Sequence, residues 1–207
     1  MVTLKINGKT RNITPISKLT FKQLNDIIVK AKVTDLKEYL SVYLDMDLIE
    51  LMDAEIKSAS LPALHQSIFD VDFEETIKTA PKTFTYNDNI HIVDEIRLAT
   101  FGKNYFFDLY HSQHAQGKLN TYELCIYALA VALSTKNDMT EVNVIYSDLI
   151  HKNWRLVLPT AFFLLKRFTK RKSGSMLMLM NFTWELKKIK WQNKSALMRL
   201  RRMERTM

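Results

Sequence analysis

Three polar side chains near the middle of the chain have the residue types of a metal site. Asp108, His111 and His114 are spaced so that a helix would bring them to one face. The Gln, Ser, Ala and Gly residues around them favour a loop instead, and no fourth ligand follows at the spacing of known zinc motifs. We therefore predict no bound metal and no cofactor.

Nucleophilic and acid–base chemistry also lacks a convincing set of residues. The single cysteine, Cys125, is flanked by Leu, Ile, Tyr and Ala, which predicts a packed thiol rather than an activated one. The carboxylate pairs Glu74/Glu75 and Asp45/Asp47 lie in polar stretches, where solvated surface explains them. The four glycines form neither G-x-x-x-x-G-K-[ST] nor G-x-G-x-x-G, the loops that hold phosphates. We expect a non-enzymatic protein with no small-molecule substrate.

The strongest chemical feature is the charge of the C-terminal part. Residues 166–207 carry 13 lysines and arginines against 2 acids, whereas residues 1–165 carry 17 against 20. Such segregation indicates a polyanion or an acidic protein surface as the partner, although a solvated basic helix on its own acidic body would give the same pattern. The residues predicted to bind protein or nucleic acid are Lys170, Arg171, Lys172, Trp184, Lys187, Lys188, Lys190, Trp191, Lys194, Arg199, Arg201 and Arg202.

The same region carries apolar side chains suited to a partner. Phe182, Leu186 and Ile189 recur at helical spacing, and Trp184 and Trp191 form a neighbouring stripe. Six of the ten methionines lie in the last 32 residues, where flexible thioethers suit an adaptable surface. These features favour protein binding. The alternatives are base stacking on nucleic acid, permanent packing on the body of the protein, and binding to an anionic membrane surface.

The N-terminal residues predict a β-hairpin. Val2, Leu4 and Ile6 alternate with polar residues, and Asn7-Gly8 supplies the two positive-φ residues of a type I′ turn. After Pro15, a capping box of Thr20 and Gln23 starts a helix that is expected to reach about residue 32. Residues 83–87 alternate as well, and we expect them to join the hairpin as a third strand.

The rest of the body is expected to be helical. Asn120 and Glu123 form a second capping box before an entirely apolar segment, which predicts a central buried helix ending at Leu133. Further helices are predicted from Asp35, from Ile92 to Phe101 with Gly102 at its end, from Asp138 or Thr140, and to Phe168 with Pro159 near the first turn. No repeat with a period of 20 to 50 residues is visible.

Composition agrees with this plan. The chain is 47% hydrophobic and 25% charged, as in ordinary globular proteins, and its four glycines and four prolines argue against a many-stranded sandwich or barrel. We predict a mainly α (α+β) fold: a hairpin and helical body over residues 1–169, a linker at 170–175, and a long basic helix at 176–207.

The sequence also bears on compartment. The apolar stretch Leu156–Leu165 is about half of the roughly 20 residues that a bilayer span needs. We therefore expect no membrane span. The alternating N-terminus is unlike a signal peptide, and a single cysteine favours a reducing compartment, so secretion is not expected.

The layout of the chain resembles that of the small assembly proteins of tailed bacteriophages. The segments that carry the likeness are Met1-Val-Thr-Leu-Lys-Ile-Asn-Gly-Lys, Leu19-Thr-Phe-Lys-Gln-Leu, Leu119-Asn-Thr-Tyr-Glu-Leu-Cys-Ile-Tyr-Ala-Leu-Ala and Leu158-Pro-Thr-Ala-Phe-Phe-Leu-Leu. Tail assembly chaperones are the nearest in layout. The resemblance includes no specific motif, so it transfers no site residue. It implies a non-enzymatic protein of the host cytoplasm or the virion that binds viral structural proteins. The basic C-terminal helix is not part of that layout, which leaves contact with DNA open.

Overall fold

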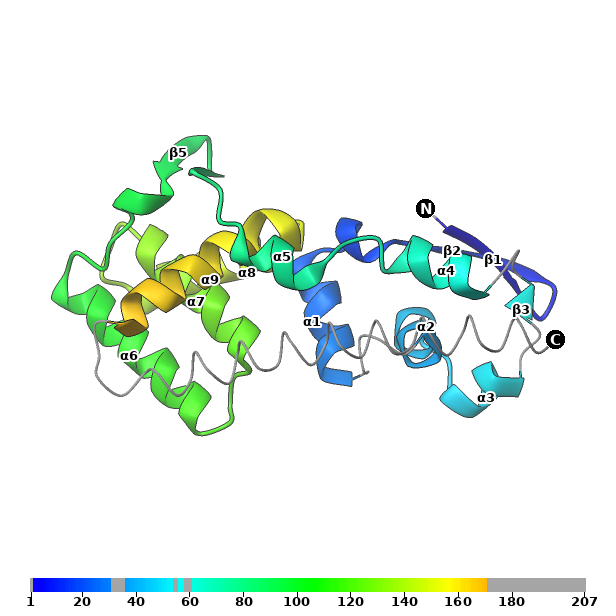
Figure 1. Cartoon of the computed structure of the whole chain (residues 1–207). Helices are drawn as coiled ribbons and strands as arrows, with labels where there is room; N and C mark the ends of the chain where they lie inside the picture. The colour runs from blue at the N-terminus through cyan, green and yellow to red at the C-terminus, as the bar shows by residue number, and fades with distance from the viewer. Residues whose placement is uncertain (1, 31–35, 54–55, 58–60, 171–207) are drawn as a thin grey trace. The chain divides into compact units, whose positions relative to one another are not determined.

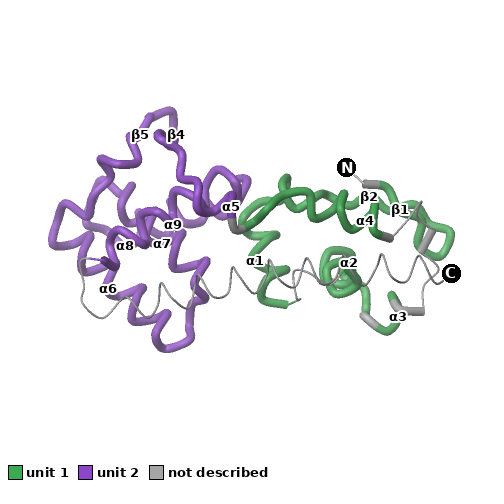
Figure 2. The backbone as a smooth tube through the Cα atoms, viewed as in Figure 1, with its two compact units in different colours: residues 1–73, 185–207 green, residues 74–184 purple. Residues whose placement is uncertain are grey.

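The chain forms two compact units. The computed structural model describes residues 2–30, 36–53, 56–57 and 61–170. The boundary between the units lies between Phe73 and Glu74, as Figure 2 shows by colour. The predicted class is confirmed, because helices dominate the described residues and the N-terminus forms a hairpin. Residues 171–175 of the predicted linker and the predicted helix at 176–207 lie outside the described residues.

The first unit begins with a three-stranded antiparallel sheet. Its strands are β1 (Val2–Ile6), β2 (Lys9–Ile13) and β3 (Ile56–Lys57), in the order β2-β1-β3. Asn7 and Gly8 take φ values of 50° and 76°, as the predicted type I′ turn requires. The third strand is thus β3 and not residues 83–87, so that part of the prediction was wrong.

Short helices complete the first unit. They are the 3-10 turn η1 (Ile16–Lys18) and the helices α1 (Phe21–Lys30), α2 (Leu36–Leu44), α3 (Leu48–Asp53) and α4 (Leu61–Ile68). The predicted capping box at the start of α1 is confirmed: Gln23 N donates to Thr20 Oγ1 at 3.2 Å, and Thr20 N donates to Gln23 Oε1 at 3.0 Å. The helix α1 then buries Phe21, Leu24 and Ile27 on one face.

The second unit begins with α5 (Phe73–Lys78), which starts at the boundary, and continues with a hairpin of its own. Residues Thr83–Tyr86 form β4 and pair with β5 (Asn89–Ile92) across a turn at Asn87 and Asp88. These two turn residues have φ values of 46° and 62°. The 3-10 turn η2 (Val93–Glu95) follows.

The helix predicted from Ile92 to Phe101 is therefore wrong, because α6 (Phe101–Ala115) begins where that helix should end. Thr100 caps α6, and its side chain accepts a hydrogen bond from Lys103 N at 3.2 Å. Gly102 sits in the first turn rather than after the last. A Cβ atom at Gly102 would lie 2.5 to 2.7 Å from side-chain atoms of Asn137, so a larger residue there would require the Asn137 side chain to shift.

Four helices form the body of the second unit (Figure 1). They are α6, α7 (Thr121–Leu133), α8 (Met139–Ile150) and α9 (Trp154–Lys170). The predicted central helix is α7, which packs against the other three and is buried along most of its length. Its capping box is also confirmed, since Asn120 accepts from Glu123 N at 2.9 Å and Asn120 N donates to Glu123 Oε2 at 2.8 Å.

The sequence predicted Pro159 near the first turn of this helix, but α9 begins at Trp154 and Pro159 lies inside it. The helix starts earlier because Asn153 Oδ1 accepts a hydrogen bond from Arg155 N at 2.9 Å, which caps the first turn ahead of Trp154. Pro159 has no N–H to bond to the Arg155 carbonyl one turn before it. Arg155 is exposed, so water can bond to that carbonyl in its place.

The two units contain the same local structure, and corresponding residues differ by 80 in number. The pair Ile6↔Lys9 of the first hairpin corresponds to Tyr86↔Asn89 of the second, and Leu4↔Arg11 corresponds to Phe84↔His91. In each hairpin both turn residues have positive φ. The register and the turn type are therefore repeated, although most of the side chains differ.

The repeat continues into the first helix after each hairpin. Thr20 and Thr100 both cap a helix by accepting from the N–H three residues later, at 3.2 Å in each case. Between residues 2–21 and 82–101, five of 20 positions are identical: Thr3/Thr83, Asn7/Asn87, Ile16/Ile96, Thr20/Thr100 and Phe21/Phe101. The two copies of this repeat lie 80 residues apart, a longer period than the 20 to 50 residues typical of repeat proteins.

Candidate functional site

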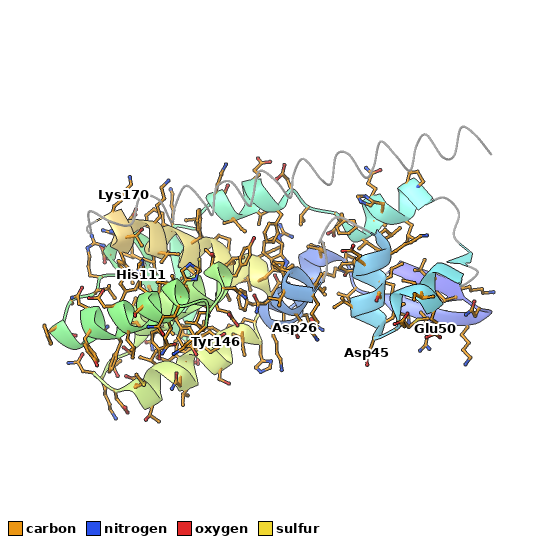
Figure 3. All side chains as sticks on the ribbon, turned by 90° about the horizontal axis from the view of Figure 1, so that it is seen from below. Asp26, Asp45, Glu50, His111, Tyr146 and Lys170 are labelled. Carbon is orange, nitrogen blue, oxygen red and sulfur yellow. The ribbon has the colours of Figure 1, made fainter. Side chains whose placement is uncertain are left out.

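The predicted binding residues lie almost entirely beyond the described part of the chain. Arg171, Lys172, Trp184, Lys187, Lys188, Lys190, Trp191, Lys194, Arg199, Arg201 and Arg202 all lie outside the described residues. Lys170 is described: it is exposed and is the last residue of α9, labelled in Figure 3. The structure therefore describes only the first of the predicted binding residues.

The cationic region already starts within α9. Lys166 is exposed one turn before Lys170, so the two ammonium groups share one face of the helix. Arg167 lies between them and donates from Nη1 to the carbonyl oxygen of Asp94, at 2.8 Å. Arg97 donates to the same carbonyl oxygen and, at 3.0 Å, to that of Ile96. Two guanidinium groups thus converge on η2, and two exposed lysines lie in the last turns of α9.

The proposed metal ligands lie in a helix rather than in the predicted loop. The helix α6 contains Asp108, His111 and His114, and their spacing of three residues places them on a shared face of that helix. His114 Nδ1, however, lies 2.8 Å from the carbonyl oxygen of Leu119 and is engaged in closing the end of α6. Burial, and then the nearby His114, lower the pKa of His111. Within the described ranges, no group of three His, Cys, Asp or Glu side chains is arranged to hold a metal ion.

Cys125 is a packing residue. Its side chain is fully buried in α7, and burial raises the pKa of the thiol well above its ordinary value. A protonated, inaccessible thiol is neither a nucleophile nor a metal ligand. The prediction of a packed thiol is confirmed.

Three of the four paired carboxylates are surface groups, and the side chain of Glu74 lies outside the described part of the structure. Asp45 and Asp47 are exposed, and Asp47 Oδ1 accepts from Ile49 N at 2.7 Å to start α3. Glu75 is exposed in α5. Exposed carboxyl groups at these positions lack the shielded setting that acid–base chemistry needs.

A stack of three tyrosines joins α6, α7 and α8, and the sequence did not reveal it. The rings of Tyr110 and Tyr127 are 4.0 Å apart at 16°, and those of Tyr127 and Tyr146 are 3.9 Å apart at 8°. Tyr110 Oη also donates to Asn143 Oδ1 at 3.2 Å. The stack fixes the helices side by side through flat ring contacts.

The stacked phenols remain protonated at neutral pH. Burial, and then Tyr127, raise the pKa of Tyr110 to about 12. Burial followed by the charge of Glu123 raises the pKa values of both Tyr127 and Tyr146. Such groups can donate hydrogen bonds but are poor bases and poor nucleophiles, so the stack is a structural device. Each tyrosine lies in a different helix, and no local sequence spacing signals that the three meet.

The second hairpin presents apolar side chains to solvent, which the sequence reasoning also missed. Ile90 is 71% exposed and Ile92 is 48% exposed, both on β5. The alternation of residues 89–92 was visible in the sequence, but the neighbouring residues were assigned to a helix. A type I′ turn assignment for Asn87-Asp88 would have found the hairpin.

No protein-family model, curated protein or solved structure matches this chain. Among the described helices, none has both the length and the apolar character needed to cross a bilayer. That result agrees with the prediction from Leu156–Leu165.

Proposed function

We propose that this chain is a non-enzymatic assembly or structural protein of a tailed bacteriophage, and that its basic C-terminal residues bind other viral structural proteins. The assignment to phage assembly rests on the likeness of layout given above. On this proposal the protein acts in the host cytoplasm or in the virion.

The proposed binding role of the C-terminal residues rests on the segregation of charge along the chain. Residues 166–207 have a net charge of 13 − 2 = +11, and the remainder of the chain has 17 − 20 = −3. A concentrated cationic segment attracts an acidic surface over a distance and orients the encounter. The Met and Trp side chains in the same segment supply the adaptable apolar contacts that charge alone does not give.

The test uses the full-length chain with three tail lysines reversed. K187E/K188E/K190E should lose the viral structural proteins that the wild-type chain captures from infected cells, as identified by mass spectrometry. A matched control reverses three exposed lysines of the body, K22E/K30E/K118E, and should capture as the wild type does. Equal capture by both variants, or capture of no viral protein by the wild type, would contradict the proposal.

Nucleic-acid binding is the second candidate, favoured by the exposed Lys166 and Lys170 that continue the basic region into α9. If the basic residues neutralise phosphates, the affinity for random double-stranded DNA should fall steeply with salt because counterions are released. For six or more phosphate contacts, the loss is roughly 10³-fold between about 50 and 200 mM salt. Fluorescence anisotropy with a labelled duplex measures it, and absent or salt-independent binding would remove this candidate.

A further inference from the structure

The two repeated hairpins carry opposite charge. Residues 3–16 contain the cations Lys5, Lys9 and Arg11 and no acid, a net charge of +3. The corresponding residues 83–96 contain Asp88, Asp94 and Glu95 and no Lys or Arg, a net charge of −3. Two segments with the same backbone structure are therefore one basic and one acidic.

Each hairpin also has an open edge strand. In the first unit β1 lies between β2 and β3, so β2 is an edge strand that pairs with no other described strand than β1, and Lys9, Thr10, Arg11 and Asn12 on it are all exposed. In the second unit β5 pairs only with β4 among the described residues. Unpaired backbone N–H and C=O groups on such edges are templates for another strand.

The side chains on the two edges differ in whether they repel or accept a further strand. The cations Lys9 and Arg11 on β2 repel a second basic edge, which is how many proteins keep edge strands apart. On β5 the exposed positions hold Ile90 and Ile92, where β2 has Thr10 and Asn12. The β5 edge thus exposes two isoleucines and carries no Lys, Arg, Asp or Glu, and acids lie beyond both of its ends.

Two of these acids place exposed negative charge beyond the ends of β5. Asp88 is exposed at the turn before β5, and Glu95 is exposed in η2 after it. Asp94 contributes less, because Arg97 and Arg167 both donate to its carbonyl oxygen and bring positive charge close to it. The β4 edge has no comparable pair of flanking acids, since Lys82 precedes β4 directly.

We propose that the β2 edge of one copy of this chain pairs with the β5 edge of a second copy. Strand pairing supplies the backbone hydrogen bonds, and Lys9 and Arg11 bring positive charge to an edge that Asp88 and Glu95 flank with negative charge. Pairing of β2 with β2, or of β5 with β5, brings like charges together and is disfavoured. This contact goes beyond the proposed function and does not depend on it, because it uses neither the C-terminal residues nor a viral partner.

Sedimentation velocity of the full-length chain tests the pairing. The wild type should gain mass as its concentration rises from about 5 to about 200 μM, the range in which weak specific contacts form. K9E/R11E should weaken this self-association about tenfold or more, and D88K/E95K should do the same, because each creates repulsion at the junction. An equimolar mixture of the two variants should associate again, since the reversed edges are complementary.

The control reverses two exposed lysines away from both edges. K22E/K118E makes the same change in net charge as K9E/R11E and should self-associate as the wild type does. A wild type that stays monomeric over the whole range, a control that loses association equally, or a mixture that does not recover would each overturn the proposal. Circular dichroism of each variant shows whether it is folded, and recovery in the mixture requires that both are.

Discussion

The repeated phenylalanines show how one residue type at one local position can have two roles. Phe21 is 1% exposed at the start of α1, whereas Phe101 is 88% exposed at the start of α6. The caps before them are the same, so the difference lies in what packs against each helix. Phe21 belongs to the core of the first unit, and Phe101 contributes little to the folding of the second.

We therefore expect F21A and F101A to differ strongly in stability. Removing the buried ring of Phe21 should lower the free energy of unfolding by about 3–5 kcal/mol, because it leaves a cavity. Removing the exposed ring of Phe101 should change it by less than about 0.5 kcal/mol. Urea denaturation followed by circular dichroism measures both, and equal effects of the two substitutions would contradict the described burial.

His111 should make folding sensitive to mild acid. Its pKa is lowered in the folded protein by burial and by His114, so the folded state favours the neutral ring. The unfolded ring binds a proton near pH 6.5. The stabilisation is therefore complete above the unfolded pKa and is lost as pH falls below it.

Melting temperatures measured between about pH 5 and pH 8 test this sign. H111Q should flatten the acid side of the profile relative to the wild type. H151Q changes an exposed histidine and should leave the profile unchanged. Identical slopes for the wild type and H111Q would show that His111 is not the group responsible.

At the scale of elements, the tyrosine stack links three helices and sets an alkaline limit on their stability. The folded pKa of Tyr110 is raised to about 12 by burial and then by Tyr127, and those of Tyr127 and Tyr146 are raised as well. Unfolded tyrosines ionise near pH 10. Stability from the stack is thus intact below about pH 10 and is lost as pH rises through the folded pKa values.

Absorbance of tyrosinate against pH should separate the two groups of tyrosines. We expect part of the signal near pH 10 and a later part at higher pH that comes from the stack and from Tyr39, whose pKa burial also raises, accompanied by unfolding. Y127F should reduce the later part, whereas Y105F, which changes an exposed side chain of α6, should leave it intact. A single step that includes all the tyrosines near pH 10 would contradict the effect of burial.

The elements that the sequence predicted well are those decided by neighbouring residues. The Asn7-Gly8 turn, the Thr20–Gln23 box and the Asn120–Glu123 box each close over a few residues, so their chemistry is visible in the letters alone. The pairing of Thr83–Tyr86 was missed because it depends on Asn87-Asp88 adopting positive φ, which Asp favours less than Gly does.

The candidate site also divides into features that neighbouring residues decide and features that depend on contacts between distant elements. The charge of the C-terminal region and the packing of Cys125 follow from composition and near neighbours. The ring stack and the exposed β5 edge depend on which helices and strands meet in space, and helical or strand period does not carry that information. The opposite charges of the two hairpins are visible in the sequence. They belong to corresponding positions only once the strand registers show that Lys9 of the first hairpin is equivalent to Asn89 of the second.

For the whole molecule, the proposed contact joins unlike surfaces of identical chains. Such contacts do not stop at two copies, and they produce rings or open filaments according to the rotation that they impose. We expect assemblies larger than a dimer at high concentration, and their mass should fall as salt is raised, because exposed charges are screened. Sedimentation at several ionic strengths measures this, and growth that stops at the dimer would indicate a symmetric interface instead.

The three parallel rings of Tyr110, Tyr127 and Tyr146 also give the second unit an intrinsic optical reporter. Aromatic groups held in a fixed, asymmetric setting produce near-ultraviolet dichroism, and that signal vanishes when side-chain packing loosens while helices persist. The wavelength range of phenols can therefore distinguish the native bundle from a swollen helical intermediate without any added label. Variants such as Y127F would then register loss of packing separately from loss of helix.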